Sequence, residues 1–229
     1  MSSAPIVTID GPSGSGKGTI SRAVADRLGW HLLDSGALYR LVALAGERAG
    51  LEPADRDGHA RLAAGMDVVF SVESDGGECV TLAGERVTAE IRSEAAGQGA
   101  SRVAAWPAVR TALLRRQRAF ARPPGLVADG RDMGTVVFPH APLKVFLTAS
   151  PEARALRRYK QLKDKGSDVS LPALSREIAE RDLRDSTRAV APLKPAPDAA
   201  VIDSTDLSIG EVVDRVLALG AARALWTSS

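Results

Sequence analysis

Several residue types that mark particular classes of protein are rare or missing in this chain of 229 residues. The single cysteine, Cys79, excludes an internal disulfide framework and a cysteine-rich metal site, and fits a reducing compartment. Asparagine is absent, which excludes the Asn-Lys-x-Asp motif with which GTPase switches read guanine. No apolar run is long enough to cross a bilayer, and the N-terminus leads straight into a strand without a basic leader. We therefore expect a cytoplasmic protein.

Charge of either sign is not in excess. The formal net charge is +2, from 30 Lys+Arg and 28 Asp+Glu, so we expect neither a nucleic-acid nor a membrane partner. The basic residues are mostly arginine and cluster locally, which favours bound phosphate groups. With 45% hydrophobic residues the chain can bury a sizeable core, and we expect one domain that carries insertions. We also expect a monomer. The three histidines, His31, His59 and His140, have no metal-ligand spacing.

Short apolar runs and helical patterns alternate along the chain. The runs that predict strands are "PIVTI", "WHLLDSG", "GLVADGRD", "LKVFLTAS" and "AAVIDST". Helical periodicity covers residues 37–49, 107–121, 151–164, 171–188 and 209–222. This alternation predicts an α/β fold with a five-stranded parallel sheet flanked by helices. Ligands of such sheets bind beyond the carboxyl ends of the strands.

One stretch, "MDVVFSVESDGGECVTLAGERVT", breaks this alternation of strands and helices. Apolar and polar residues alternate in it around the turns Asp75-Gly76-Gly77 and Ala83-Gly84. It predicts an inserted lobe of small antiparallel strands.

A glycine-rich turn, "DGPSGSGKGTI", joins the first strand to a helix and matches Gly-x-x-x-x-Gly-Lys. Backbone N–H groups of such a turn, the helix N-terminus and Lys17 can bind the phosphates of a nucleoside triphosphate. A turn without a ligand is the alternative, and the strand before it and the helix after it disfavour that reading. The usual hydroxyl after the lysine is replaced by Gly18, with Thr19 following, which leaves the Mg²⁺ contact open.

Two further groups of polar residues follow predicted strands. In "LLDSGALYR", Ser35 stands at the start of a predicted helix, and Tyr39 and Arg40 follow one turn later. Capping of the helix explains Ser35. Arg40 is a cation near the positive end of the helix dipole, which favours an anionic partner. In "LVADGRD", Asp129 ends a buried strand, where a phosphate-loop sheet places the carboxylate that orients Mg²⁺. An ordinary solvated turn is the alternative there.

Arginines recur at helical spacing in two later segments. Arg181, Arg184 and Arg188 share one predicted helical face, and Arg154 and Arg158 are four apart. Either run alone fits an exposed, salt-bridged helix. Beside a triphosphate loop they predict a lid over transferring phosphates. If the acceptor is itself a phosphate, it needs no general base, and positioning with charge neutralisation suffices.

Taken in order, these motifs resemble bacterial cytidylate kinases, which are nucleoside monophosphate kinases of the P-loop class, over nearly the whole chain. The resemblance rests on "IDGPSGSGKGT", "LLDSGALYR", "ASRVAAWPAVR", "LLRRQR", "DGRDMGTVVFP" and Arg181-Asp182-x-x-Asp185-x-x-Arg188-x-x-x-Pro192-Leu193. It implies transfer of the γ-phosphoryl of ATP, with Mg²⁺, to CMP or dCMP. It also implies a monophosphate-binding insertion at about 36–105 and a lid at about 151–188. In nucleoside monophosphate kinases, a glycine is the usual residue at the position that follows Lys17.

The resemblance assigns roles residue by residue. The expected ATP-binding residues are Gly11, Pro12, Ser13, Gly14, Ser15, Gly16, Lys17, Gly18 and Thr19. The expected catalytic residues are Lys17, Arg131, Arg154, Arg158 and Arg188. The expected substrate-binding residues are Ser35, Tyr39, Arg40, Ser101, Arg110, Asp129, Asp132, Arg181, Asp185 and Arg188. No direct metal ligand is assigned; Thr19 and Asp129 are candidates to hold Mg²⁺ through water.

Among the substrate residues, Ser101, Arg110 and Asp132 would read the base, and their chemistry suits cytosine. Cytosine has an amino donor where uracil has a carbonyl, so a carboxylate such as Asp132 accepts from the first and repels the second. Two alternatives remain open: a P-loop kinase for UMP, AMP or a hydroxylated metabolite, and a module that binds ATP without transferring phosphate.

Overall fold

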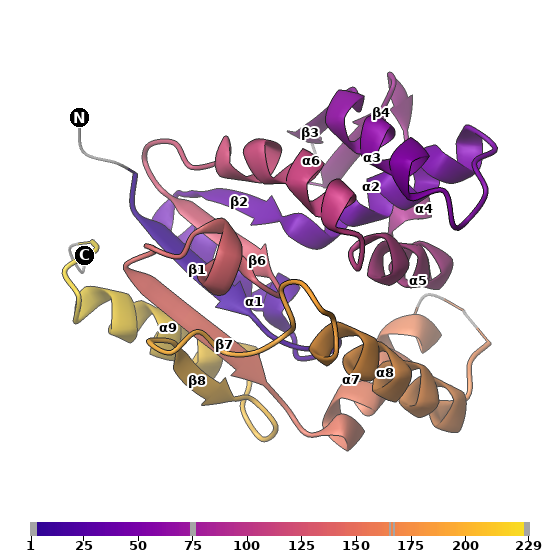
Figure 1. Ribbon diagram of the computed structural model, residues 1–229. Coiled ribbons are helices and arrows are strands. Elements are labelled where there is room, and N and C mark those ends of the chain that lie inside the picture. The colour runs from indigo at the N-terminus through magenta and orange to yellow at the C-terminus, as the bar shows by residue number, and fades with distance from the viewer. Residues whose placement is uncertain (1–3, 74–76, 165, 167, 227–229) are drawn as a thin grey trace. The chain divides into compact units, whose positions relative to one another are not determined.

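The computed structural model describes residues 4–73, 77–164, 166 and 168–226. The chain divides into two compact units. The core unit comprises the residues up to Asp34 and those from Gln117 onward, and the inserted unit comprises Ser35–Arg116 (Figure 1). The insertion expected at about 36–105 falls within the second of these.

The core unit is built on a five-stranded sheet whose strands are all parallel. Its order is β2-β6-β1-β7-β8, with bounds β2 (His31–Asp34), β6 (Leu126–Gly130), β1 (Ile6–Asp10), β7 (Leu143–Thr148) and β8 (Ala200–Asp203). The predicted fold class is therefore confirmed. Because β1 is the central strand, the glycine-rich turn that follows it lies at the middle of the carboxyl edge, beside Gly130, which pairs with Asp10.

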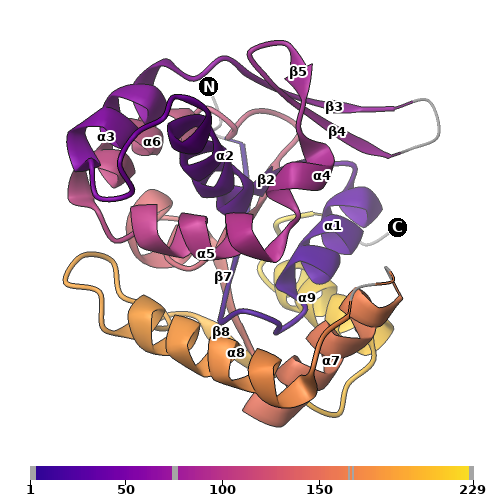
Figure 2. The same cartoon turned by 90° about the vertical axis from the view of Figure 1, so that its right-hand side faces the viewer.

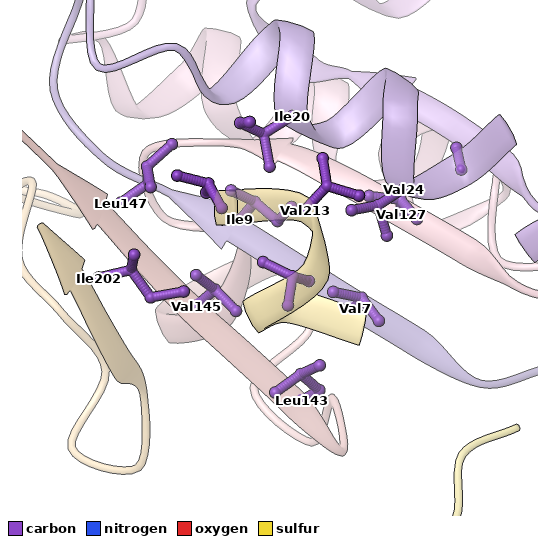
Figure 3. Packing of buried hydrophobic residues seen from close by; sticks show 13 residues of the cluster. Val7, Ile9, Ile20, Val24, Val127, Leu143, Val145, Leu147, Ile202 and Val213 are labelled. Atoms are coloured by element: carbon purple, nitrogen blue, oxygen red, sulfur yellow. The ribbon is translucent and has the colours of Figure 1, made fainter. Parts of the chain in front are cut away.

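The main hydrophobic core lies between this sheet and two helices, α1 (Lys17–Leu28) and α9 (Ile209–Ala221) (Figure 3). Branched side chains fill it: Val7, Ile9, Ile20, Val24, Val127, Leu143, Val145, Leu147, Ile202, Val212, Val213 and Val216. The strands contribute near-continuous apolar runs because helices cover a parallel sheet on its faces. Both helices have definite ends: Gly29 closes α1 with φ 63°, and a capping box of Ser208 and Glu211 opens α9.

Helices α7 (Pro151–Lys163) and α8 (Leu171–Ser186) lie side by side in the core unit (Figure 2). Ser150 and Ser170 cap their N-termini by accepting from Ala153 N and Ala173 N. The prediction that Arg188 shares the helical face of Arg181 is wrong, because α8 ends at Ser186. The hydroxyls of Ser186 and Thr187 both donate to the Leu183 carbonyl, which ends the helix before Arg188.

The inserted unit contains α2 (Ser35–Arg48), α3 (Arg56–Gly65), β3 (Val68–Val72), β4 (Glu78–Leu82), β5 (Glu85–Arg86), α4 (Thr88–Ile91), α5 (Glu94–Val103) and most of α6 (Pro107–Arg118). The predicted antiparallel strands are confirmed, in the order β3-β4-β5. Ala83 and Gly84 turn the chain with φ of 51° and 81°. Asp75 and Gly76 of the other predicted turn lie outside the described residues.

The sequence did not predict α3 and α5. Helix α5, "EAAGQGASRV", has few large apolar residues and two glycines, which lowers its helical signal. Gly99 has a packing role, since a Cβ there would lie 2.8 Å from the Ala43 Cβ of α2. Among the described helices, none combines the length and apolar character that a membrane span requires.

We expect Leu147→Ala to lower the free energy of unfolding by about 2–5 kcal/mol, because Leu147 is fully buried at the centre of the core. Val201→Ala is the control on the neighbouring strand, where the side chain is 60% exposed, and we expect a loss of about 1 kcal/mol or less. Denaturant unfolding of both variants measures the difference. Equal losses would contradict this placement of the core.

Candidate active site

The turn between β1 and α1 has the geometry of a phosphate-binding loop. Gly14 and Gly16 have φ of 76° and 90°, which side chains rarely adopt, and a Cβ on Gly11 would lie 2.0 Å from the Leu147 carbonyl oxygen. Helix α1 begins at Lys17 without a side-chain cap and without an acidic residue in its first turn. N-terminal amides of a helix that no side chain caps can bind an anion.

Lys17 carries a buried positive charge within this loop. Its Nζ donates to the Pro12 carbonyl oxygen at 3.0 Å, a neutral acceptor. Burial, above all, lowers the pKa of Lys17 to about 7; the charges of Arg131 and Arg181 act in the same direction, while Asp129 and Asp185 oppose them. A bound polyphosphate would supply the negative charge that this ammonium group needs.

Asp129, at the carboxyl end of β6, approaches the start of α1. A Cβ on Gly18 would lie 3.4 Å from Asp129 Oδ2, so the missing side chain at position 18 leaves room beside the carboxylate. Thr19 follows in the same turn and is exposed. Carboxylate and hydroxyl oxygens are ligands that suit Mg²⁺, so these residues fit the ion.

Asp185 lies buried between two arginines. Its Oδ2 accepts from Arg131 Nε at 3.0 Å, and its Oδ1 pairs with Arg188 Nη2 at 3.1 Å. Burial opposes ionisation, but the charges of Arg131, Arg188 and Arg181 hold the pKa of Asp185 below its usual range. Arg188 reaches Asp185 by folding back from beyond the end of α8, and its Nε also donates to the Asp185 carbonyl at 3.3 Å. The cluster keeps an excess of positive charge near Lys17.

Arg154 joins α7 to the phosphate loop and to α8. Its Nη1 donates to the Ser13 carbonyl at 3.0 Å and pairs with Asp182 Oδ2 at 2.6 Å, and its Nε donates to the Ala149 carbonyl at 3.1 Å. Arg158 lies on the same helix, where its Nη1 donates to Gln161 Oε1 at 2.8 Å. Arg154 thus contacts both the phosphate loop and α8.

Arg157 belongs to this site, and sequence reasoning missed it. Its guanidinium donates to Ser204 Oγ at 3.1 Å, to the Thr205 carbonyl at 3.3 Å, and to the carbonyl oxygens of Ser204 and Ser15. It thereby ties α7 to the loop after β8 and to the phosphate loop. Its spacing of three from Arg154 could have predicted it, because residues three apart also lie on one helical face. The prediction used only the spacing of four between Arg154 and Arg158.

A pocket of about 370 Å³ opens beside the phosphate loop. The loop itself, Arg157 and Arg158 line one part of it, and Ile20, Leu207 and Ile209 provide an apolar wall. Its size and mixed lining suit a small ligand with a flat apolar part, such as a nucleobase.

Asp10 and Asp132 both lie at the start of a short π-helix, η1 (Met133–Val137), which Asp132 directly precedes. Asp10 accepts from Met133 N and Gly134 N, both at 2.8 Å. Burial raises the pKa of Asp10 to about 7 against these two bonds, and the charges of Asp132 and Asp129 add to the rise. Asp132 is 2% exposed and makes no side-chain capping bond to η1.

The other expected substrate residues belong to the inserted unit. Arg110 lies over the Tyr39 ring, 5.8 Å from its centre, and donates to the Ala104 carbonyl at 3.3 Å. Arg40 Nη1 donates to the Ile91 and Ser93 carbonyls at 2.7 and 3.2 Å. These carbonyls, at the end of α4, offset part of the unfavourable position of Arg40 near the start of α2. Ser101 on α5 and Ser35, the first residue of α2, are buried.

The groups that gather on the carboxyl edge of the sheet are a phosphate loop, a buried lysine and arginines held in place by backbone carbonyls. The fold and this site define a P-loop kinase. The sequence model of the family described as cytidylate kinase matches residues 7–221. The chain belongs to the cytidylate kinase family and is an enzyme.

Curated relatives match over nearly their whole length. A cytidylate kinase of Pseudomonas syringae pv. tomato is 61% identical over 221 residues, which is 96% of each chain. Those of Stutzerimonas stutzeri and Azotobacter vinelandii are each 60% identical, over 96% and 98% of this chain and 97% and 99% of theirs. Among solved structures, a gluconokinase from Sinorhizobium meliloti 1021 is 18% identical with a TM-score of 0.47, covering 97% of this chain and 94% of that chain.

Lys17→Met keeps the length of the side chain and removes its charge, so we expect it to stabilise the nucleotide-free protein. The gain at about pH 6 should be about 1 kcal/mol or more, because the folded protein then holds a buried ammonium. The folded pKa of about 7 lies below the ordinary 10.5, so the unfolded chain binds more protons between these values. Wild-type stability therefore rises relative to the variant over this range, and the gain should shrink towards about pH 10.

Denaturant unfolding at about pH 6 and about pH 9.5 measures this gain. Lys194→Met, at an exposed lysine, is the matched control and should show no such pH-dependent gain. A Lys17→Met protein that is less stable than wild type at both pH values would contradict the cost assigned to the charge.

Proposed function

We propose that the protein transfers the γ-phosphoryl group of ATP to CMP or dCMP, giving ADP and CDP or dCDP. The observation that carries this proposal is the identity of 60–61% with curated cytidylate kinases over at least 96% of the chain. The local geometry supports it, since the loop, the lysine and the arginines are all groups that bind phosphate.

The donor nucleotide is proposed to bind at the phosphate loop. Its phosphates accept hydrogen bonds from the ammonium of Lys17 and from backbone amides of residues 11–19, except Pro12, which has no N–H. Its base occupies the pocket between Ile20, Leu207 and Arg158. Mg²⁺, when bound with the nucleotide, neutralises part of the phosphate charge. Asp129 and Thr19 would hold it through water molecules.

The residues proposed to bind the acceptor nucleotide are those that the resemblance to cytidylate kinases assigns. We assign the base to Ser101, Arg110 and Asp132, the phosphate to Tyr39, Arg40, Arg131 and Arg188, and the sugar to Arg181 and Asp185, with Ser35 and Asp129 nearby. Asp185 already accepts from two arginines, but each carboxylate oxygen has two lone pairs, so a sugar hydroxyl can still donate to it.

The arginines of the core unit are proposed to act by charge and position. An acceptor phosphate is already anionic, so no side chain has to remove a proton from it. Lys17, Arg131 and Arg188 neutralise charge on the reacting groups, and Arg154 and Arg158 act from α7. Because Asp185 and backbone carbonyls orient these cations beforehand, little reorganisation is needed when charge develops.

We further propose that residues 36–105 form the monophosphate-binding insertion and residues 151–188 the lid of a single kinase domain. The compact inserted unit and the pair α7 and α8 support these assignments. We propose a cytoplasmic monomer without nucleic-acid or membrane partners; the single cysteine and the near balance of charge support this setting.

ADP release in the presence of ATP, Mg²⁺ and a panel of acceptors tests the function. We expect CMP and dCMP to exceed UMP and AMP in kcat/KM by about tenfold or more. Lys17→Ala is the control and should lower kcat by about 10²- to 10³-fold, since it removes one preorganised cation. Preference for UMP, AMP or a hydroxylated metabolite would replace the proposed substrate, and ATP binding without ADP release would indicate a non-catalytic module.

Asp132→Ala should damage base selection more than phosphate transfer. Its loss leaves the cytosine amino group without an acceptor and lifts the repulsion of the uracil carbonyl, which is worth about ten- to a hundredfold in the ratio of kcat/KM for CMP over UMP. Asp26→Ala, at an exposed position of α1, is the control. An equal fall for both substrates in a variant with wild-type Tm would refute the base-reading role.

A further inference from the structure

The first amides of η1 are bound by a carboxylate from a different strand. Asp10, the last residue of β1, accepts from Met133 N at Oδ1 and from Gly134 N at Oδ2, both at 2.8 Å. An aspartate that directly precedes a helix ordinarily accepts such bonds itself. Asp132 has that position, yet its side chain makes no capping bond to η1. Asp10 therefore caps the start of η1, although it belongs to β1.

The turn is also pressed against the sheet. A Cβ on Gly134 would lie 2.9 Å from Thr8 Oγ1 and 3.1 Å from Lys144 Cδ, so Gly134 packs closely on β1 and β7. At its far end, Arg118 Nε donates to the Val137 carbonyl at 3.0 Å. Besides this packing, the two bonds to Asp10 tie the start of η1 to the end of β1.

Asp10 itself is not available to a substrate in this arrangement. It is buried, and each of its two carboxylate oxygens accepts one backbone amide. It is also the residue directly before Gly11, and Gly130 is its partner on β6. One side chain therefore connects the start of the phosphate loop to the segment that carries Arg131 and Asp132.

We propose that Asp10 is a positioning residue for nucleotide selection. By capping the first amides of η1, it fixes where Asp132 and Met133 lie relative to the phosphate loop, and with them the place of the Asp132 carboxylate. This inference rests on the proposed function, in which Asp132 reads the acceptor base.

The test is Asp10→Asn in the full-length enzyme. The amide keeps one acceptor oxygen but turns an NH₂ group towards the second backbone N–H, so one of the two bonds is lost. We expect the ratio of kcat/KM for CMP over UMP to fall about tenfold, mainly through KM for CMP, with KM for ATP changed by less than about threefold. Hydrogen exchange at Met133 and Gly134 should become faster while the core amides of Val7 and Val145 keep their protection.

Asp203→Asn is the matched control. Asp203 also ends a strand and accepts from a backbone amide, that of Thr205 at 2.9 Å, but it has no bond to η1. We expect it to leave the CMP over UMP ratio unchanged. An Asp10→Asn enzyme that keeps this ratio, or that loses activity on both substrates equally, would show that Asp10 supports only the fold.

If Asp10→Asn does not fold, Gly134→Ala displaces the same turn from its other side while leaving the Asp10 carboxylate in place, and it should cause the same loss of selectivity. If wild type prefers another nucleoside monophosphate, the proposed function fails, and the ratio of that preferred base over the others then tests Asp10. Unchanged selectivity in the folded variant overturns the inference in either case.

Discussion

The buried ammonium group of Lys17 is the feature on which the candidate site depends. It lies against a neutral carbonyl, at the point where the central strand passes into a helix, with Arg131 and Arg181 disfavouring its charge and Asp129 and Asp185 favouring it. Keeping a charge there is unfavourable without a bound anion, because burial and the neighbouring arginines together outweigh the two carboxylates. The same arrangement favours a polyphosphate, since the binding free energy includes relief of that cost. Glycines make the loop possible by letting its amides turn towards the same place.

Backbone groups provide many of the partners that hold the other charged side chains. Arg154 and Arg157 donate to carbonyls of the phosphate loop, and Arg40 donates to carbonyls at the end of α4. Asp10 accepts from amides of η1. Such bonds connect loops that are distant in the sequence and fix the orientation of each side chain. Polar groups fixed in this way need little rearrangement when a charged ligand binds.

Much of the fold could be predicted from local patterns. The apolar runs and the glycine-rich turn indicated the parallel sheet and the loop, because both depend on residues that are neighbours in the sequence. Helices α3 and α5 and the π-helix η1 were not predicted, since small residues and short length leave weak periodicity. The extension of α8 to Arg188 was wrong because hydroxyls at Ser186 and Thr187 end the helix, an effect that periodicity does not register.

The sequence by itself determined which residues can serve phosphate chemistry: the glycines of the loop, Lys17, and the carboxylates and arginines that follow predicted strands and helices. It also determined the class of fold, through the alternation of apolar runs with helical patterns. Only the tertiary structure decided which partner each charge has. Asp185 lies between Arg131 and Arg188, Arg157 reaches the loop after β8, and Asp10 caps a turn 123 residues away. The physical reason is that a charged side chain interacts with whatever lies within a few ångströms, and the packing of the whole core decides which segments those are.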